Sequence, residues 1–246
     1  MPRFFVQGSA ITETEITLSG ENAHHISYAL RMAVGDEITV SDGAGSIYLC
    51  RITSMDGSVV VADILSKGSD RAESPIEITL FQAYPKSDKL EFIIQKAVEL
   101  GVSAVVPFES ERCIKRPKAD KVAHILERQK RIAEEAAKQS GRSVLPTVHA
   151  PISFDGMLAA AKEFPLALFC HPSEGCRSLA AIFAAHPDVH RIAIVVGSEG
   201  GFSEEEVARA EAEGLIPTSL GTRVLRCETA PMYLLSAISY AYELPR

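Results

Sequence analysis

The sequence predicts an α/β protein in which a small β-rich domain, residues 1–70, precedes a larger domain of alternating strands and helices, residues 76–246. Short apolar runs separated by turn signals follow one another in the first part. The segment from Ser66 to Pro75, SKGSDRAESP, is polar and rich in breaker residues, which is typical of a linker. After it, strand-like and helix-like segments alternate, which indicates a parallel sheet covered by helices.

The composition excludes several classes of protein. The chain has 246 residues, of which 46% are hydrophobic and 23% charged, so a packed core is expected. No apolar run approaches the roughly 20 residues that a membrane span needs, and the first residues do not read as a secretory signal. The five cysteines show no CxxC pair and no metal-ligand spacing. We therefore expect a cytoplasmic protein with free thiols, no metal and no membrane contact.

The first domain reads as a compact barrel of short strands. ITLSG predicts one strand, and the stretch from Asp36 to Leu65 contains three more, separated by DGAGS and MDG. Between them, ENAHHISYALRM has helical spacing. In the second domain, IEITLFQAY and SAVVPF predict strands on either side of a helix, SDKLEFIIQKAVELG, whose apolar stripe ends at Gly101. A long helix then runs to Gly141, and LALFCHP and RIAIVVG predict strands buried on both faces.

A glycine-rich bend follows the last of these strands, in IVVGSEGGFSEEEV. It is not a P-loop, a dinucleotide fingerprint or a nucleophile elbow, because GK[ST], GxGxxG and GxSxG are all absent. Its three glycines permit positive φ and let a ligand approach the main chain. Ser203 and Glu206 have the spacing of a capping box. An ordinary tight turn between strand and helix is the alternative.

A second bend, TRVLRCET, lies between strand-like IPTSLG and an apolar helix that begins near Thr229. Pro231 fits the first turn of that helix. The bend carries Arg223, Arg226 and Glu228 in one short connection. Local pairing of surface charges is the alternative to a functional role.

The charge is unevenly distributed. The net charge is −7, yet residues 110–142 contain ten Lys or Arg against five Asp or Glu, a local charge of +5. A solvated helix face explains this as well as a phosphate-facing patch does.

The two bends, GSEGGFSEEE and LGTRVLRCETA, together resemble the paired C-terminal motifs of the SPOUT class of RNA methyltransferases. Within that class the chain resembles the family that methylates N3 of a uridine in 16S ribosomal RNA. The resemblance covers the whole chain, through RFFV, HHISYALRMAVGDEI, KSDKLEFIIQKAVELGV, SERC and RIAEEAAKQSGRSVLP. Ser198 departs from the proline usual in the family, and Cys227 stands where other residues are common, so a catalytic thiol is not expected.

The resemblance implies a SPOUT domain whose C-terminal part forms a deep trefoil knot that binds S-adenosylmethionine, a PUA-like β-barrel that helps to hold RNA, and a homodimer. The implied substrate is the small ribosomal subunit, at the family's target, uridine 1498 of 16S ribosomal RNA. Two alternatives are a non-catalytic RNA-binding or ribosome-assembly factor and a SPOUT methyltransferase that acts on transfer RNA.

The resemblance also implies site residues. Glu228 is expected to act as base or orienter and Arg226 to stabilise charge on the uracil oxygens, with a structural Arg226–Glu228 pair as the alternative. His171 is either a wall of the cofactor site or a turn residue. The full cofactor set is Phe169, His171, Gly197, Glu199, Gly200, Gly201, Leu220, Gly221, Leu225, Arg226 and Thr229. The residues expected to contact RNA are Arg3, Arg31, Arg112, Lys115, Arg116, Arg128 and Arg142.

Overall fold

The computed structural model describes residues 1–69, 73–114, 116–171 and 176–244. It divides into two compact units, one formed by Met1–Glu73 with Ala137–Leu145 and the other by Ser74–Ala136 with Pro146–Arg246. The first unit therefore includes a short segment that the sequence alone placed in the second domain. Lys115, one of the expected RNA contacts, lies outside the described residues.

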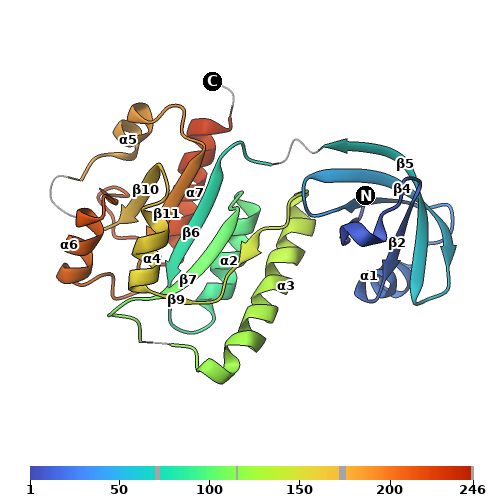
Figure 1. Ribbon diagram of the computed structural model, residues 1–246, viewed down its shortest axis with the longest axis horizontal. Helices are drawn as coiled ribbons and strands as arrows, with labels where there is room; N and C mark the ends of the chain where they lie inside the picture. The colour runs from blue at the N-terminus through green and yellow to red at the C-terminus, as the bar shows by residue number, and fades with distance from the viewer. Residues whose placement is uncertain (70–72, 115, 172–175, 245–246) are drawn as a thin grey trace. The chain divides into compact units, whose positions relative to one another are not determined.

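The first unit is built on a five-stranded sheet, curled into a half-barrel (Figure 1), in the order β1-β3-β4-β5-β2. β1 pairs with β3 in parallel and the other neighbours are antiparallel. The helical insert is shorter than the sequence predicts and ends in a π-helical turn, η2 (His25–Ala29), after α1 (Glu21–His24). The strands are β1 (Arg3–Phe5), β2 (Glu15–Ser19), β3 (Glu37–Ser41), β4 (Ser46–Met55) and β5 (Val59–Ser69), and the turn η1 (Gly8–Ala10) follows β1.

The core of the first unit follows from the two-residue period of its strands. In β2, Ile16 and Leu18 are fully buried while Glu15, Thr17 and Ser19 are exposed. Apolar side chains from the other strands and from the helical insert, among them Phe4, Ile26, Ile38, Val40, Cys50, Ile52 and Val60, complete the cluster. Alternation of this kind buries one face of an antiparallel sheet.

Hydrogen bonds to Glu73 hold the segment Ala137–Leu145 in the first unit. The Glu73 carboxylate accepts hydrogen bonds from the main-chain N–H of Ser143 (2.7 Å) and Val144 (2.9 Å) and from Nη2 of Arg142 (2.8 Å). The Ser41 hydroxyl donates to the carbonyl oxygen of Ser143 (2.7 Å). The side chain of Arg142 is only 6% exposed. The expectation that Arg142 contacts RNA is therefore corrected: its guanidinium is buried against Glu73.

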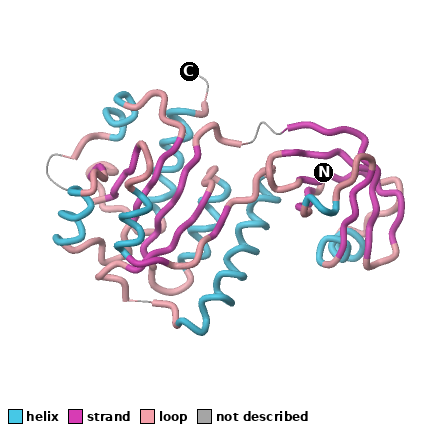
Figure 2. The backbone as a smooth tube through the Cα atoms, in the orientation of Figure 1, coloured by secondary structure: helices cyan, strands magenta, loops and turns pink. Residues whose placement is uncertain are grey.

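The second unit contains a parallel sheet in the order β12-β10-β11-β6-β7-β8, with β9 also paired to β7. β10 and β11 are buried along nearly their whole length, as predicted for strands covered on both faces, and β6 is buried in the same way. Figure 2 traces these strands as neighbouring magenta segments. They are β6 (Glu77–Ala83), β7 (Ala104–Glu109), β8 (Thr147–Val148), β9 (Ile152–Ser153), β10 (Leu166–Cys170), β11 (Arg191–Val196) and β12 (Ile216–Thr218).

Helices cover both faces of this sheet, with α4 on the near face and α2 and α7 on the far face in Figure 1. The helices are α2 (Lys89–Glu99), α3 (Val122–Ser140, after the turn η3, Ala119–Lys121), α4 (Phe154–Ala161), α5 (Leu179–Ala185), α6 (Glu204–Ala212) and α7 (Thr229–Tyr242). In the described part of the chain, no helix is long and apolar enough to cross a membrane. The predicted parallel α/β arrangement is confirmed, and the knot that the resemblance implies stays a prediction.

Candidate cofactor pocket

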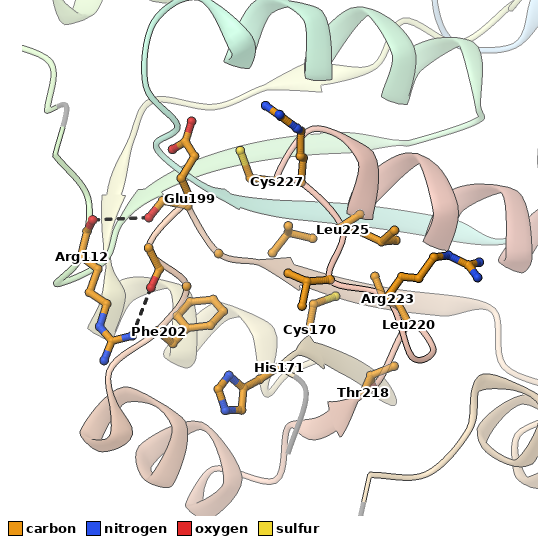
Figure 3. Close-up of a pocket in the computed structure, with 18 of the residues that line it drawn as sticks. Arg112, Cys170, His171, Glu199, Phe202, Thr218, Leu220, Arg223, Leu225 and Cys227 are labelled. Carbon is orange, nitrogen blue, oxygen red and sulfur yellow. Dashed lines mark hydrogen bonds between the residues drawn. The ribbon is translucent and has the colours of Figure 1, made fainter. Parts of the chain in front are cut away.

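A cavity of about 540 Å³ opens at the carboxyl ends of β10, β11 and β12, the edge at which open parallel sheets bind ligands. Both bends identified in the sequence line it, and Figure 3 shows their side chains around the same space. The lining residues are Lys89, Arg112, Cys170, His171, Val196, Gly197, Ser198, Glu199, Gly200, Gly201, Phe202, Thr218, Leu220, Gly221, Thr222, Arg223, Val224, Leu225, Arg226, Cys227 and Ala230. The fold thus brings together two segments about twenty residues apart in the sequence.

The three glycines of the first bend serve two different purposes. Only Gly201 has a positive φ, +65°. At Gly197 a Cβ atom would lie 3.2 Å from Cα of Gly201 and 3.1 Å from the ring of Phe202. At Gly200 it would lie 3.0 Å from Cβ of Arg112. The sequence suggested positive φ for all three, whereas two of them are needed because neighbouring groups approach so closely.

The predicted capping box is confirmed. The Ser203 hydroxyl accepts from the main-chain N–H of Glu206 (3.3 Å), and Oε2 of Glu206 accepts from the N–H of Ser203 (3.0 Å). Glu206 is only 5% exposed, and its Oε1 also accepts from the N–H of Glu111 (2.8 Å). One carboxylate therefore caps α6 and ties the SERC segment to the first bend.

Arg112 of the SERC segment completes this wall of the pocket. Its Nη1 donates to the carbonyl oxygen of Gly200 (3.1 Å), and its own carbonyl oxygen accepts from the Ser198 hydroxyl (3.5 Å), the two dashed contacts of Figure 3. Arg112 was expected to contact RNA. It is exposed, and its side chain also fixes the shape of the first bend.

Phe202, which follows the glycines of the first bend, contributes apolar surface to the cavity. Phe202 is 3% exposed and packs against Phe169, with 4.3 Å between ring centroids. Phe169 itself is fully buried and does not line the cavity, so it supports the wall through Phe202. Cys170 and His171 do line it, and the N–H of His171 donates to the carbonyl oxygen of Phe169 (2.9 Å). A mixed lining of this kind suits a ligand with a neutral aromatic base.

Residues 220–227, which include most of the second bend, also line the cavity. Gly221 has a φ of +105°, and Val224 is 93% exposed. Arg226 lines the cavity, while Thr229 and Glu228 do not. Of the expected cofactor residues, the cavity therefore excludes Phe169 and Thr229 and includes the rest.

Lys89 is a pocket residue that the sequence reading missed. Its Nζ lies 2.9 Å from Oε1 of Glu199 and 3.1 Å from Oε2 of Glu228. Glu228 therefore pairs with Lys89, and the suggested Arg226–Glu228 pair does not form. The available signal was the second lysine of KSDK, which begins a helix shortly after the end of a strand.

These contacts shift the pKa values of the two carboxylates and of the neighbouring thiol of Cys227. Burial raises the pKa of Glu199, but hydrogen bonds from Lys89 and from the N–H of Lys86 outweigh it, so the pKa lies below its ordinary value. The pKa of Glu228 is likewise lowered, because its main-chain N–H, the Cys227 thiol and Lys89 offset the effect of burial. Burial and the neighbouring Glu228 raise the pKa of Cys227 to about 12, so it stays a thiol at neutral pH, in keeping with the expectation that it is not a nucleophile.

Comparison with known proteins identifies the family of the chain. The family model for the RNA methyltransferase domain matches residues 72–239, and the family model for the RNA methyltransferase PUA domain matches residues 18–65. A ribosomal RNA small subunit methyltransferase E from Bacillus subtilis is 34% identical over 100% of this chain and 99% of its own length. The chain belongs to this RNA methyltransferase family. The resemblance seen in the sequence is confirmed.

The chain is also similar to solved methyltransferase structures over nearly its whole length. A ribosomal RNA small subunit methyltransferase E from Neisseria gonorrhoeae, bound to S-adenosyl methionine, is 33% identical with a TM-score of 0.87, covering 98% of each chain. A methyltransferase from Legionella pneumophila, in complex with the same cofactor, is 31% identical with a TM-score of 0.86 over 97% of each chain.

The basic residues expected to contact RNA differ in their solvent exposure and in their partners within the protein. Arg31 is exposed, with a positive φ of 52°. The side chains of Arg116 and Arg128 are 55% and 64% exposed, and they pair with Glu109 and Glu91. Arg3 donates to the carbonyl oxygen of Gly141. RNA contact by these residues stays a prediction.

Proposed function

We propose that the protein uses S-adenosylmethionine to methylate N3 of a uridine in 16S ribosomal RNA of the small ribosomal subunit. The observation that carries this proposal is the cavity between the two bends at the strand ends, in a chain that belongs to an RNA methyltransferase family. It is proposed to act in the cytoplasm, where ribosomal subunits are assembled.

The pocket fits the cofactor in size and chemistry. Its volume of about 540 Å³ lies within the usual range for small-molecule sites. Gly197, Gly200 and Gly201 all line the cavity, and having no side chains they contribute only main-chain atoms to it. Phe202 and Leu225 supply apolar surface for a base, and we infer that main-chain groups near Gly197, Leu220 and Gly221 bind its polar edge.

S-adenosylmethionine supplies a methyl group on a positively charged sulfur. The protein must then hold the uridine in line with that group and remove the proton from N3. The carboxylate of Glu228, which its low pKa keeps ionised, is the proposed proton acceptor. Arg226 lines the cavity and is proposed to stabilise negative charge on the uracil oxygens. Because the uridine must be unpaired to react, we infer that RNA is bound with this base turned out.

The proposed reaction is tested by incubating the protein with small ribosomal subunits that lack the modification and with labelled cofactor, and then mapping the methylated nucleotide. We expect methylation at one uridine, and a 10²- to 10⁴-fold lower rate, roughly, for Glu228→Gln. Transfer RNA is tested in parallel, as the substrate of the alternative function. Absence of any thermal shift with the cofactor would instead favour a non-catalytic RNA-binding factor, and a fully active, folded Glu228→Gln would remove Glu228 from the mechanism.

We further propose that the protein is a homodimer whose copies meet along α7. This helix presents a shallow apolar groove of about 470 Å³, lined by Thr229, Met232, Tyr233, Ser236, Ala237 and Tyr240. Tyr233 and Tyr240 both line this groove and are 44% and 75% exposed, so α7 presents aromatic surface to solvent. Continuity with the pocket supports a copy of the chain as the occupant, because Ala230 of the same helix lines the cofactor cavity.

The homodimer is tested by replacing Tyr233 and Tyr240 with glutamate. Charges buried at an interface are costly, so we expect sedimentation equilibrium to show a dimer for the unchanged protein and a monomer for the variant. Tyr28→Glu, in the first unit, is the matched control because Tyr28 is also exposed, at 61%. A monomeric unchanged protein, or dimers in all three samples, would contradict the assignment.

A further inference from the structure

Three segments of the chain meet at the ammonium group of Lys89. Lys89 is the first residue of α2, Glu199 belongs to the first bend, and Glu228 stands at the end of the second. The Nζ atom contacts one carboxylate from each bend, at 2.9 and 3.1 Å. Glu199 is held a second time, because both its oxygens accept from the N–H of Lys86, at 3.2 and 3.1 Å.

We propose that Lys89 is a positioning residue that keeps the two bends at the separation the cofactor requires and aims the carboxylate of Glu228. The proposal rests on the proposed function, because it assigns a role within the same site. It adds the first residue of α2 to a pocket otherwise made mainly by the two bends, the SERC segment and the ends of β10, β11 and β12.

The balance of charge around Lys89 explains why this cation matters. Two carboxylates share one ammonium, so the cluster of Lys89, Glu199 and Glu228 carries a net charge of −1. The three side chains are 29%, 26% and 20% exposed, so water screens their interaction only in part. Without Lys89, two negative groups on separate bends would face each other unopposed, and the bends would move apart.

The protonation states fit positioning rather than proton transfer by Lys89 itself. Hydrogen bonds to Glu199, and then to Glu228, raise the pKa of Lys89, so it stays an ammonium throughout the working range of pH. The groups that face Glu228 are Lys89 and the Cys227 thiol, whose Sγ donates to Oε2 (3.2 Å), with Glu199 across the same ammonium. Of these, only Lys89 is positively charged, and Arg226 makes no ion pair with Glu228 in the described part of the chain.

The backbone ahead of α2 gives independent support. Ser87 has a φ of +57°, a left-handed conformation that is uncommon for a residue other than glycine. This conformation is adopted between the N–H of Lys86 and the ammonium of Lys89, both of which contact Glu199. Strain of this kind tends to persist where the surrounding structure holds it at a functional site.

The test uses three variants of the full chain: Lys89→Met, Lys89→Arg, and Lys89→Met combined with Glu199→Gln. Cofactor affinity is measured by calorimetry, and methyl transfer to small subunits is measured as a function of pH. We expect Lys89→Met to weaken cofactor binding by about tenfold, the scale of coupling within one charged network. Lys89→Arg should recover most of this loss. The double variant should also recover most of the affinity. Only Glu228 of the three side chains is then charged, so the net charge is again −1 and no second carboxylate repels it.

The pH profile separates aiming of Glu228 from simple support of the bends. Lys89 lowers the pKa of Glu228, and a proton acceptor works only when ionised. Loss of Lys89 should therefore move the acidic limb of the rate profile to higher pH, and Lys89→Arg should move it back. A variant with altered packing alone would lose affinity without moving that limb.

Two results would overturn the proposal. In one, Lys89→Met folds with unchanged melting and shows unchanged cofactor affinity and an unchanged acidic limb. In the other, adding Glu199→Gln brings no recovery, so that repulsion between the two carboxylates is not the cause of the loss. An unchanged protein that binds the cofactor but methylates no subunit would contradict the proposed function instead, while the affinities of the three variants would still decide whether Lys89 holds the bends.

Discussion

Gly197→Val should weaken binding of S-adenosylmethionine by about a hundredfold while the chain still folds. Even the first side-chain carbon at this position would lie 3.2 Å from Cα of Gly201 and 3.1 Å from the ring of Phe202. Phe202 cannot give way easily, because it packs against Phe169 at 4.3 Å between centroids. The first bend must therefore open. Overpacking of this kind costs about 1–3 kcal/mol, and here the distortion falls on the surface proposed to bind the cofactor.

Gly214→Ala is the matched control for this substitution. Gly214 has a φ of +84°, and an added Cβ would meet no atom within 4 Å. It lies outside the cavity, so the change should cost about 1 kcal/mol of stability through backbone strain and leave cofactor affinity unchanged. Calorimetric titration of both variants with the cofactor measures the contrast. Equal affinities for Gly197→Val and the unchanged protein would show that the first bend does not bind the cofactor.

Much of the second unit could be predicted because its signals are local. The helix that begins at Lys89 carries its apolar stripe and its terminal glycine within fifteen residues, and the capping box of α6 is complete between Ser203 and Glu206. The shortest elements had weaker signals. β8 and β9 have two residues each, and α5 has only seven, so no period could be read in them.

The features that the sequence did not reveal depend on partners distant in the chain. Gly200 is needed because of Arg112, 88 residues earlier, and nothing near Gly200 shows this. The role proposed for Lys89 depends on its ion pairs with Glu199 and Glu228, which are distant from it in the sequence. A sequence displays each charge but not its distance from another, and a charge with a buried partner looks the same as one that faces RNA.

Arg142 is the clearest case of a charge whose partner the sequence does not show. Replacing that partner, Glu73, is expected to have the largest effect on stability. Glu73→Ala should lower the free energy of unfolding by about 3 kcal/mol, because it removes a carboxylate that is paired with Arg142, whose side chain is only 6% exposed. It also removes the acceptor for the N–H groups of Ser143 and Val144. Urea denaturation of the full chain measures the loss. Adding Arg142→Met should recover part of it, since an apolar side chain needs no partner there.

The same carboxylate predicts how the effect depends on pH. Burial raises the pKa of Glu73, but the hydrogen bonds from Arg142 and from the N–H groups of Val144 and Ser143 outweigh it, so the folded pKa lies below the ordinary value. Such a group stabilises the fold fully above its unfolded pKa and loses that contribution as the pH falls through the folded one. The difference in unfolding free energy between the unchanged protein and Glu73→Ala should therefore be largest near neutral pH and shrink in acid. A difference that stays constant down to acid pH would mean that packing, and not the charge of Glu73, holds the segment around Arg142 in place.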